Sequence, residues 1–399
     1  MRGILVTNVG KTRCAAGINC VGKLPEELNG MNISKPMIVS DHNIAKLDKF
    51  KKTVEQLKLS GISPVVFDQV TPNPKDYEVM MAAELYKKQG CDAVIGIGGG
   101  SSMDCAKGVA VMVRHEGDIM DYGRSTPNRR FFSNGRETLF CIPTTTGTGS
   151  ELSPHAVITN TTKNNRKSDV QDRLFYCDMF FLDPEFACTQ PMETMRDTGV
   201  DALSHMIDSY TNKDMLGIRS PLHEAIGLEC CRLISENLRK VIATGGADLE
   251  AVQGMQWGAA FGGAMLDLNA AAIHGLSGAL QKYRHEMTHG VSCGVIMPAC
   301  MEYNLQTAPE KFAKIADALG VDTGEMTMRE AAAASVKAVE ELLSDIRFPK
   351  FSDFNFSEQE VHEMAEISAG NSMLPLNPRP ITNAEDVRGI YLSAEKEIR

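Results

Sequence analysis

Short apolar runs alternate with amphipathic stretches over the first half of the chain. Residues 36–41 (PMIVSD), 64–67 (PVVF) and 92–97 (DAVIGI) are brief apolar runs next to turn residues, which predicts three strands. A helix is predicted over 76–89, and another after the first strand, whose apolar face would carry Leu47, Phe50, Val54 and Leu57. Strands that take turns with helices predict a parallel sheet covered by helices on both faces.

The pattern changes near residues 184–191. From Pro191 onward helical periodicity prevails, without convincing strand pairs, and alanine-rich helices are predicted near 247–267 and 328–344. A chain of 399 residues is also too long for one ordinary core. We therefore predict an α/β domain over residues 1–187 and an all-helical domain over 188–399.

The composition indicates which kinds of partner and which cellular compartment to expect. A formal net charge of -10 argues against nucleic acid or an anionic membrane surface as the main partner. The sequence has no long apolar leader and no window of about eighteen apolar residues, so we expect a cytoplasmic protein that does not span a membrane. Eleven cysteines, an odd number without a Cys-x-x-Cys pair, favour reduced thiols over a disulfide framework.

Two glycine-rich loops follow predicted strands. The strand at 92–97 leads into Gly98, Gly99, Gly100 and Ser101, and a helix is predicted to follow over 105–112. Glycines let the backbone approach an anion, and a helix N-terminus adds unpaired N–H groups, so this loop suits a diphosphate. The loop at 143–151 (PTTTGTGSE) follows the apolar run 139–142 and suits phosphate and ribose oxygens. The alternatives are a plain tight turn for the first loop and a solvated turn for the second.

Potential metal ligands lie in the helical half. Asp201 and His205 are four residues apart, so a helix over 197–210 would place them on one face about a turn apart. His274 and His289 stand in apolar surroundings, and each precedes a glycine. Three imidazoles and one carboxylate suit Fe(II) or Zn(II) and are too rich in nitrogen for Ca²⁺ or Mg²⁺. The alternative is an amphipathic helix whose Asp caps a neighbour and whose His packs in the core.

These motifs together resemble one known family. The stretches GGGSSMDCAK, PTTTGTGSE and DALSH and the two His-Gly pairs occur over nearly the whole chain in the order typical of the iron-containing (group III metal-dependent) alcohol dehydrogenases. The resemblance implies an α/β N-terminal Rossmann-like domain with a parallel sheet plus an all-α C-terminal domain, the dehydroquinate synthase-like fold. It also implies NAD(P) and a divalent metal that face each other across the cleft between the domains, and a homodimer formed through the N-terminal domain.

The resemblance assigns roles to individual residues. It implies Fe(II), or alternatively Zn(II), held by Asp201, His205, His274 and His289, and a diphosphate loop of Gly98, Gly99, Gly100 and Ser101. It places Thr144, Thr145 and Thr148 around the nicotinamide half and Lys167 at the cofactor ribose. Asp41 matches the acid that meets the adenosine ribose and repels a 2′-phosphate, which favours NAD(H) over NADP(H). Asp104 and Lys107 are left as either structural or cofactor-linked.

The sequence departs from the family pattern in two places. Many members carry a proton-relay histidine four residues after the third metal ligand, where this chain has Gly278. His285 is the candidate substitute, with the alternatives of a competing metal ligand or a surface residue. His155 stands where a related member would place an amide, and together with Arg284 it would favour a polar or anionic substrate; the alternative is a local change without consequence. We therefore name His285 and His155 as candidate catalytic residues.

The expected function follows from the resemblance. It is an NAD(H)-linked alcohol dehydrogenase or aldehyde reductase acting on a short-chain, polar aldehyde of the lactaldehyde, 3-hydroxypropionaldehyde or anionic sulfoacetaldehyde type. The alternatives are a dehydroquinate synthase-like lyase, which also pairs NAD with a divalent metal, and a non-catalytic nucleotide-binding or filament-forming protein.

Overall fold

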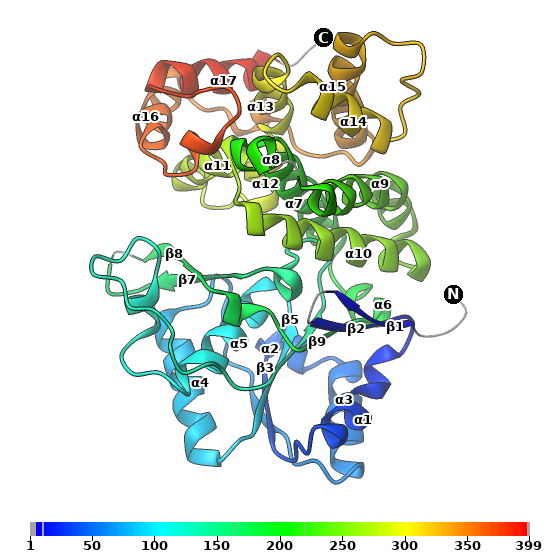
Figure 1. Ribbon diagram of the computed structural model, residues 1–399, viewed down its shortest axis with the longest axis vertical. Coiled ribbons are helices and arrows are strands. Elements are labelled where there is room, and N and C mark those ends of the chain that lie inside the picture. The colour runs from blue at the N-terminus through cyan, green and yellow to red at the C-terminus, as the bar shows by residue number, and fades with distance from the viewer. Residues whose placement is uncertain (1–4, 10–11, 164, 219, 397–399) are drawn as a thin grey trace. The chain divides into compact units, whose positions relative to one another are not determined.

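The computed structural model describes residues 5–9, 12–163, 165–218 and 220–396 (Figure 1). The described residues form two compact units. The first holds the chain up to Thr145 together with Gly149–Gln190, and the second holds Thr146–Thr148 together with the chain from Pro191 onward. The main change between units therefore falls at Gln190, near the boundary that the sequence pattern places at residue 187.

The first unit is built on a seven-stranded sheet with the order β1-β2-β9-β6-β5-β3-β4. Only β1 and β2 are antiparallel, and every other neighbouring pair is parallel. The strands are β1 Leu5–Val9, β2 Thr12–Ala16, β3 Pro36–Val39, β4 Val65–Phe67, β5 Ala93–Gly98, β6 Leu139–Pro143 and β9 Met179–Leu182. The residues of β3, β5, β6 and β9 are buried throughout, which explains why these strands appear in the sequence as unbroken apolar runs.

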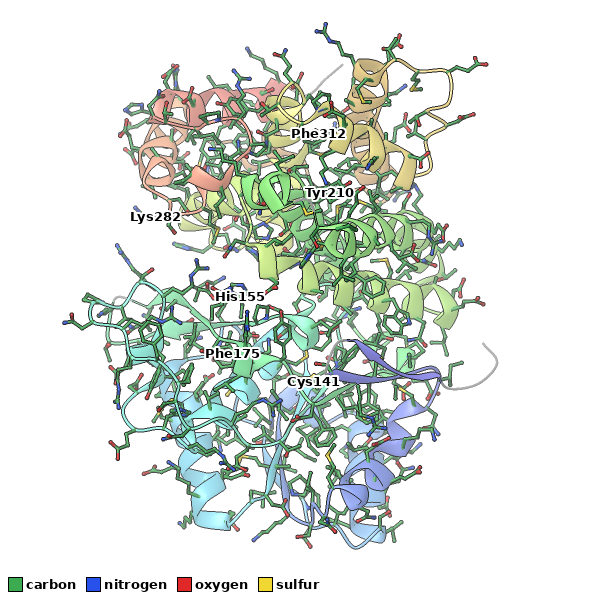
Figure 2. The ribbon with its side chains drawn as sticks, in the orientation of Figure 1. Cys141, His155, Phe175, Tyr210, Lys282 and Phe312 are labelled. Atoms are coloured by element: carbon green, nitrogen blue, oxygen red, sulfur yellow. The ribbon has the colours of Figure 1, made fainter. Side chains whose placement is uncertain are left out.

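Helices of the first unit cover this sheet with their apolar faces. They are α1 Leu24–Gly30, α2 His42–Ala45, α3 Asp48–Leu59, α4 Asp76–Gln89, α5 Gly100–Met112 and α6 Pro184–Ala187. The predicted apolar face of α3 packs as expected: Phe50 and Leu57 join the buried core, and Leu47 and Val54 pack at its margin. Figure 2 shows Cys141 of β6 and Phe175 among the side chains of this unit.

Several features of this unit were not predicted from the sequence, among them strands β1, β2 and β9. Strands β7 His155–Asn160 and β8 Arg166–Gln171 form a separate antiparallel pair, and α5 begins at Gly100 instead of Cys105. The residues of β8 are mostly polar (RKSDVQ), so no apolar alternation marked the strand. Helix α5 can begin within the glycine triplet because Gly99 is extended (φ -76°, ψ -172°) and acts as its N-cap.

The second unit is helical, with no strand among its described residues. Its helices are α7 Met192–Thr211, α8 Lys213–Ile218, α9 Pro221–Thr244, α10 Leu249–Met265, α11 Ala272–Tyr283, α12 His289–Gly294, α13 Met297–Asn304, α14 Pro309–Ala318, α15 Met328–Asp345, α16 Glu358–Ala369 and α17 Ala384–Lys396. Helix α7 is buried from Gly199 to Thr211 and packs against α9, α10 and α12, so it forms the centre of this unit. Tyr210 and Phe312 are among its buried aromatic side chains (Figure 2).

Short 3₁₀ segments connect the larger elements. They are η1 Cys20–Lys23, η2 Ile119–Tyr122, η3 Ser150–Leu152, η4 Arg173–Phe175, η5 Leu266–Leu268, η6 Phe351–Phe354 and η7 Leu374–Leu376. Within the described chain, each helix is too short or too polar to cross a bilayer. The eleven cysteines are free thiols in the described chain, and most of them are buried.

Candidate metal centre and dinucleotide site

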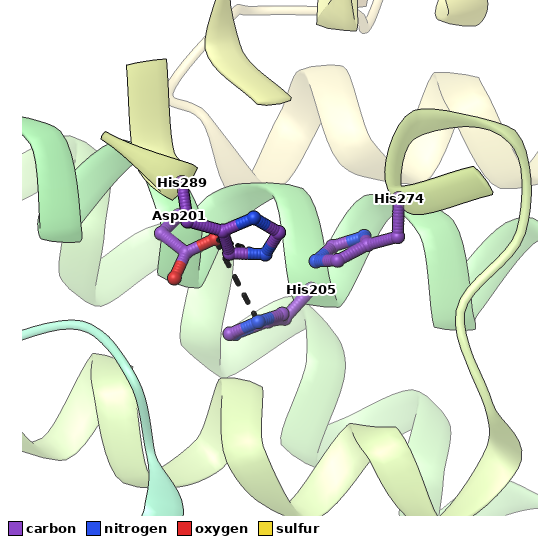
Figure 3. A group of neighbouring side chains, drawn as sticks. All are labelled: Asp201, His205, His274 and His289. Atoms are coloured by element: carbon purple, nitrogen blue, oxygen red, sulfur yellow. Dashed lines mark ion pairs between the residues drawn. The ribbon is translucent and has the colours of Figure 1, made fainter. Parts of the chain in front are cut away.

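Helix α7 supplies two of the four predicted metal ligands. Asp201 and His205 are buried on one face of this helix, and Asp201 Oδ1 lies 3.7 Å from His205 Nε2 and 3.7 Å from His289 Nε2. One ligand atom from each of Asp201, His205, His274 and His289 lies within 4.8 Å of the others (Figure 3). The His205 and His274 rings are stacked, with their centroids 4.9 Å apart. The structure thus brings together the whole predicted ligand set.

Helices α11 and α12 deliver the other two ligands. His274 lies in the first turn of α11, and His289 is the first residue of α12. A Cβ on Gly290 would stand 2.0 Å from the Asp197 carbonyl oxygen, so the start of α12 packs directly against the backbone of α7. The Thr288 hydroxyl caps α12 by accepting from Val291 N, and it donates to Asp197 Oδ2 at 2.9 Å. The glycine after His289 therefore allows the close approach that places this ligand.

The polar atoms of this group fit a divalent cation. Asp201 Oδ1 and His274 Nε2 are buried and have no hydrogen-bond partner among the described residues. Each buried polar atom left without a partner costs on the order of 1–3 kcal/mol, and coordination to a cation would remove that cost. Three imidazole nitrogens and one carboxylate oxygen suit Fe(II) or Zn(II).

Asp208 fixes the imidazole of His274. Its Oδ2 accepts from His274 Nδ1 at 2.9 Å, so the proton on Nδ1 points to the carboxylate and the lone pair on Nε2 faces the other ligands. Burial alone would lower the pKa of His274, but the hydrogen bond to Asp208 and the charges of Asp208 and Asp201 raise the pKa overall. The sequence analysis gave Asp208 no role, although its position three residues after His205, on the same helix face, was a usable signal.

Two other predicted residues of the second unit lie outside the ligand group. His285 is exposed between α11 and α12 and is not among the four clustered ligands, so the competing-ligand interpretation is wrong. Arg284 donates to Glu360 at 2.9 Å and to the Phe354 carbonyl at 3.0 Å, and its guanidinium stacks over Phe356. It is held at the start of α16, so the interpretation of Arg284 as a substrate-binding cation is wrong.

The glycine loop of the first unit packs closely against neighbouring side chains and leaves its backbone open to close approach by a ligand. Gly98 has φ +154°, and a Cβ there would stand 2.4 Å from Ser102 Oγ; a Cβ on Gly99 would stand 3.2 Å from Thr145 Cγ2. The hydroxyls of Ser102 and Thr145 are buried without a hydrogen-bond partner among the described residues. The positive end of α5 begins at the same place. These features fit a bound diphosphate, and Ser102 is a residue that the sequence analysis missed.

Asp41 follows β3, the strand next to β5, and lies beside this loop. Its Oδ1 accepts from Asn43 N at 2.9 Å and from Ile44 N at 3.1 Å, which caps α2. Its Oδ2 stands 3.5 Å from the position of a Cβ on Gly98. The carboxylate is therefore close enough to the glycine loop to meet a ribose attached to a diphosphate there.

The remaining predicted cofactor residues lie on three segments. Ser101 Oγ accepts from Asn73 N at 3.1 Å, and the Thr144 amide donates to the Gly98 carbonyl at 2.9 Å. Thr148 belongs to the second unit. Lys167 is exposed on β8, paired with Thr159 of β7.

His155, labelled in Figure 2, is the first residue of β7, and both ring nitrogens have polar neighbours. Nδ1 lies 2.8 Å from Asp169 Oδ1, and Nε2 lies 3.2 Å from the amide nitrogen of Gln171. The ammonium of Lys107 donates to the His155 carbonyl at 2.7 Å. The backbone and the ring of His155 are therefore both held in place.

Asp104 and Lys107 tie α5 to the segment before and within β7. Asp104 accepts from Ser150 Oγ at 2.6 Å and from Val157 N at 2.9 Å, and Lys107, fully buried, donates also to the Ser153 carbonyl at 3.0 Å. These contacts give both residues a structural role in the first unit.

Comparison with known proteins gives the family. Residues 11–184 match the family described as iron-containing alcohol dehydrogenase, and residues 195–394 match the C-terminal domain of the same family. The chain belongs to the iron-containing alcohol dehydrogenase family. This membership makes it an NAD-dependent, iron-containing oxidoreductase of alcohols, and it decides against the lyase and non-catalytic alternatives.

Individual members of the family are similar over nearly their whole length. Choline dehydrogenase of Bacillus subtilis is 34% identical over 376 residues, covering 94% of this chain and 91% of the relative. 1,3-Propanediol dehydrogenase of Citrobacter freundii is 32% identical over 387 residues, covering 95% and 96%. A crystal structure of 1,3-propanediol oxidoreductase aligns with a TM-score of 0.88 at 30% identity, covering 99% of this chain and 100% of that one. The predicted fold class is thereby confirmed.

Proposed function

We propose that the protein reduces a short-chain, polar aldehyde with NADH, and oxidises the corresponding alcohol with NAD, at a metal held by Asp201, His205, His274 and His289. The observation that supports this proposal best is the convergence of one carboxylate and three imidazoles, with two buried ligand atoms that have no hydrogen-bond partner in the described part of the chain. When bound, the divalent metal would polarise the substrate carbonyl as a Lewis acid, and NADH would supply the hydride.

The residues of the chain would bind the metal and the cofactor. The single carboxylate of Asp201 offsets part of the charge of a divalent ion, which leaves the centre cationic and attractive to an electron-rich oxygen. Gly98, Gly99, Gly100 and Ser101 would hold the diphosphate, with the buried hydroxyls of Ser102 and Thr145 as donors. Asp41 would accept from the adenosine ribose. Thr144, Thr148 and Lys167 would complete the site around the nicotinamide and its ribose.

Reduction of the carbonyl also consumes one proton. No histidine stands at the family's usual relay position, which is Gly278 here. We infer that His285, exposed just before α12, or water along the cofactor ribose delivers the proton. His155, whose ring contacts Asp169 and Gln171, would contribute polarity to substrate selection.

The substrate class is best supported as small and polar. The two relatives named above bear names of short polar alcohols, choline and 1,3-propanediol. Arg284 is engaged with Glu360, which removes the argument for a dedicated anion-binding cation. We therefore favour uncharged aldehydes of the 3-hydroxypropionaldehyde and lactaldehyde type over anionic sulfoacetaldehyde.

The proposal is tested by NADH oxidation with metal-loaded protein, using Fe(II) and Zn(II) in parallel. The panel contains 3-hydroxypropionaldehyde, lactaldehyde, sulfoacetaldehyde and betaine aldehyde, which separates neutral, anionic and cationic substrates. His274→Ala and Asp201→Ala should lose metal and turnover but keep measurable NADH affinity. Full activity of either variant in the metal-free state would refute the proposed site, and preference for sulfoacetaldehyde would refute the proposed substrate class.

We also infer a homodimer formed through the first unit. Strand β1 lies at one edge of the seven-stranded sheet, and an edge strand is a common place for pairing with a second chain. Light scattering coupled to size exclusion should give twice the mass of one chain, and a mass of one chain would contradict the inference.

A further inference from the structure

One face of α7 carries a row of four ionisable side chains. Asp197, Asp201, His205 and Asp208 follow one another at intervals of four, four and three residues, and all four are buried. Two of them are the proposed metal ligands of this helix. The other two contact the elements that supply the remaining ligands: Asp197 through Thr288 at the start of α12, and Asp208 at the start of α11.

Asp208 makes three hydrogen bonds with the first turn of α11. Its Oδ1 accepts from Ile273 N at 3.1 Å, and its Oδ2 accepts from His274 N at 3.0 Å and from His274 Nδ1 at 2.9 Å. The N-cap residue of α11 is Ala271, whose methyl group cannot cap the helix. Asp208 therefore provides from α7 the cap that the sequence of α11 lacks, and the same carboxylate holds the ring of the metal ligand.

We propose that Asp208 is a positioning residue that directs His274 Nε2 to the metal. It would do so by keeping the proton on Nδ1 and by fixing both the ring and the backbone that carries it. This inference rests on the proposed ligand set. An imidazole without such a partner exchanges between two tautomers and two ring orientations, and only one of these presents Nε2 as an acceptor toward the ligand group.

The contacts require a carboxylate and not merely a polar group of the same size. Both oxygens of Asp208 accept hydrogen bonds, whereas asparagine has one acceptor oxygen and an NH₂ group. In Asp208→Asn, one orientation turns the NH₂ group toward Ile273 N–H and the other turns it toward both donors of His274. In either orientation the NH₂ group faces an N–H donor of the first turn of α11, so a hydrogen bond is lost. The side-chain volume hardly changes.

The test is titration of the full-length, metal-free protein with Co(II) and Zn(II). Asp208→Asn should bind Zn(II) about 10–100-fold more weakly than the wild type, the usual loss when a partner of a metal-bound histidine is removed. Its Co(II) absorption bands in the visible should also shift, because the geometry of one ligand changes. Ser209→Ala is the matched control, since this neighbouring buried hydroxyl has no hydrogen-bond partner among the described residues. It should bind both metals like the wild type.

The outcomes separate this inference from the proposed ligand set. If the wild type and His274→Ala bind Zn(II) equally well, the proposed ligand set is wrong. A second outcome is that His274→Ala loses Zn(II) binding while Asp208→Asn keeps the wild-type affinity and Co(II) spectrum. This outcome would overturn only the positioning role of Asp208. A third outcome is that Asp208→Asn has lower thermal stability without metal but an unchanged Co(II) spectrum. Asp208 would then act only as a helix cap, and the proposal would be overturned.

A measurement on the wild type covers the case in which Asp208→Asn does not fold. In metal-free protein labelled with ¹⁵N-histidine, the Nδ1 proton of His274 should give an NMR signal that exchanges slowly with water. Metal-free Ser209→Ala, which keeps His274 and Asp208, should show the same slow signal, and the absence of this signal from metal-free His274→Ala assigns it. Rapid exchange of that proton in the wild type would overturn the proposal, because a proton held by buried Asp208 is shielded from solvent.

Discussion

Asp41 uses its two oxygens for different purposes. Oδ1 caps α2, while Oδ2 stands near the glycine loop. Asp41→Ser removes the negative charge but keeps a hydroxyl that can cap the helix. We expect the ratio of kcat/KM for NADPH to that for NADH to rise roughly tenfold or more, which corresponds to about 1.4 kcal/mol. Thermal stability should stay close to that of the wild type, and an unchanged cofactor ratio would contradict the role of Asp41 in excluding the 2′-phosphate.

Glu151 is a buried carboxyl group in the first unit, at the end of the PTTTGTGSE loop. Its Oε2 has no hydrogen-bond partner among the described residues. Burial raises its pKa from an ordinary value of 4.5 to about 7, although the nearby charge of Lys107 lowers it in part. The folded protein therefore binds this proton more tightly than the unfolded chain does. The free energy of unfolding contributed by this group falls as the pH rises from 4.5 to 7, and it is constant above that range.

Glu151→Gln removes this dependence on pH. Relative to the wild type, the variant should gain roughly 2 to 3 kcal/mol of unfolding free energy between pH 5 and pH 8. Urea unfolding of both proteins at these two pH values measures the difference. An equal difference at both pH values would show that Glu151 is ionised in the folded protein throughout this range.

At the scale of elements, the pair His289-Gly290 shows why a metal ligand can depend on its neighbour. Gly290→Ala would push a methyl group into the Asp197 carbonyl, so α12 must move away from α7 and carry His289 with it. We expect Zn(II) affinity to fall about tenfold or more. Gly278→Ala is the control, because nothing lies within 4 Å of a Cβ at this exposed position of α11. It should keep the affinity and stabilise the helix by about 0.5–1 kcal/mol. Equal affinity in the two variants would exclude the packing argument.

Elements with a strong pattern could be predicted, and elements defined by tertiary pairing could not. Strands β3, β4, β5 and β6 and helices α3 and α4 appear where the sequence pattern places them, because burial of both sheet faces forces apolar runs. Strand β8 is polar and gains its pairing from β7, so the sequence carries no local signal for it. Asp208 is similar: its partners, Ile273 and His274, are more than sixty residues away in the sequence.

The four-ligand set is the part of the site that sequence reasoning predicted most fully. Asp201 and His205 are spaced one helical turn apart, and His274 and His289 stand in apolar surroundings, so the residue types and their spacing already indicate a metal site. Arg284 shows the opposite case. Its proposed role failed because Glu360, seventy-six positions further along the chain, accepts its hydrogen bonds. A charge in a sequence shows what a residue can bind, and the fold decides whether that capacity is already used.

At the scale of the whole molecule, each ligand would join segments that are distant in sequence, and most of the residues proposed for each ligand belong to one unit. The proposed metal would connect α7, α11 and α12 in the second unit, and the dinucleotide would connect the end of β3 with the start of α5 in the first. Binding to the folded state alone stabilises it by about 2.7 kcal/mol at a hundredfold excess over Kd. The amides of those segments should then exchange about a hundredfold more slowly wherever their opening releases the ligand.

Hydrogen exchange followed by mass spectrometry can separate the two effects. Zn(II) added to metal-free protein should slow exchange in peptides covering 197–211 and 272–294, and NADH alone should slow exchange in peptides covering 39–45 and 98–112. His274→Ala should remove the first effect and leave the second, while Gly98→Ala, whose methyl group would clash with Ser102 Oγ, should do the reverse. Protection of residues 98–112 by Zn(II) without protection of residues 272–294 would contradict the assignment of the metal to α7, α11 and α12.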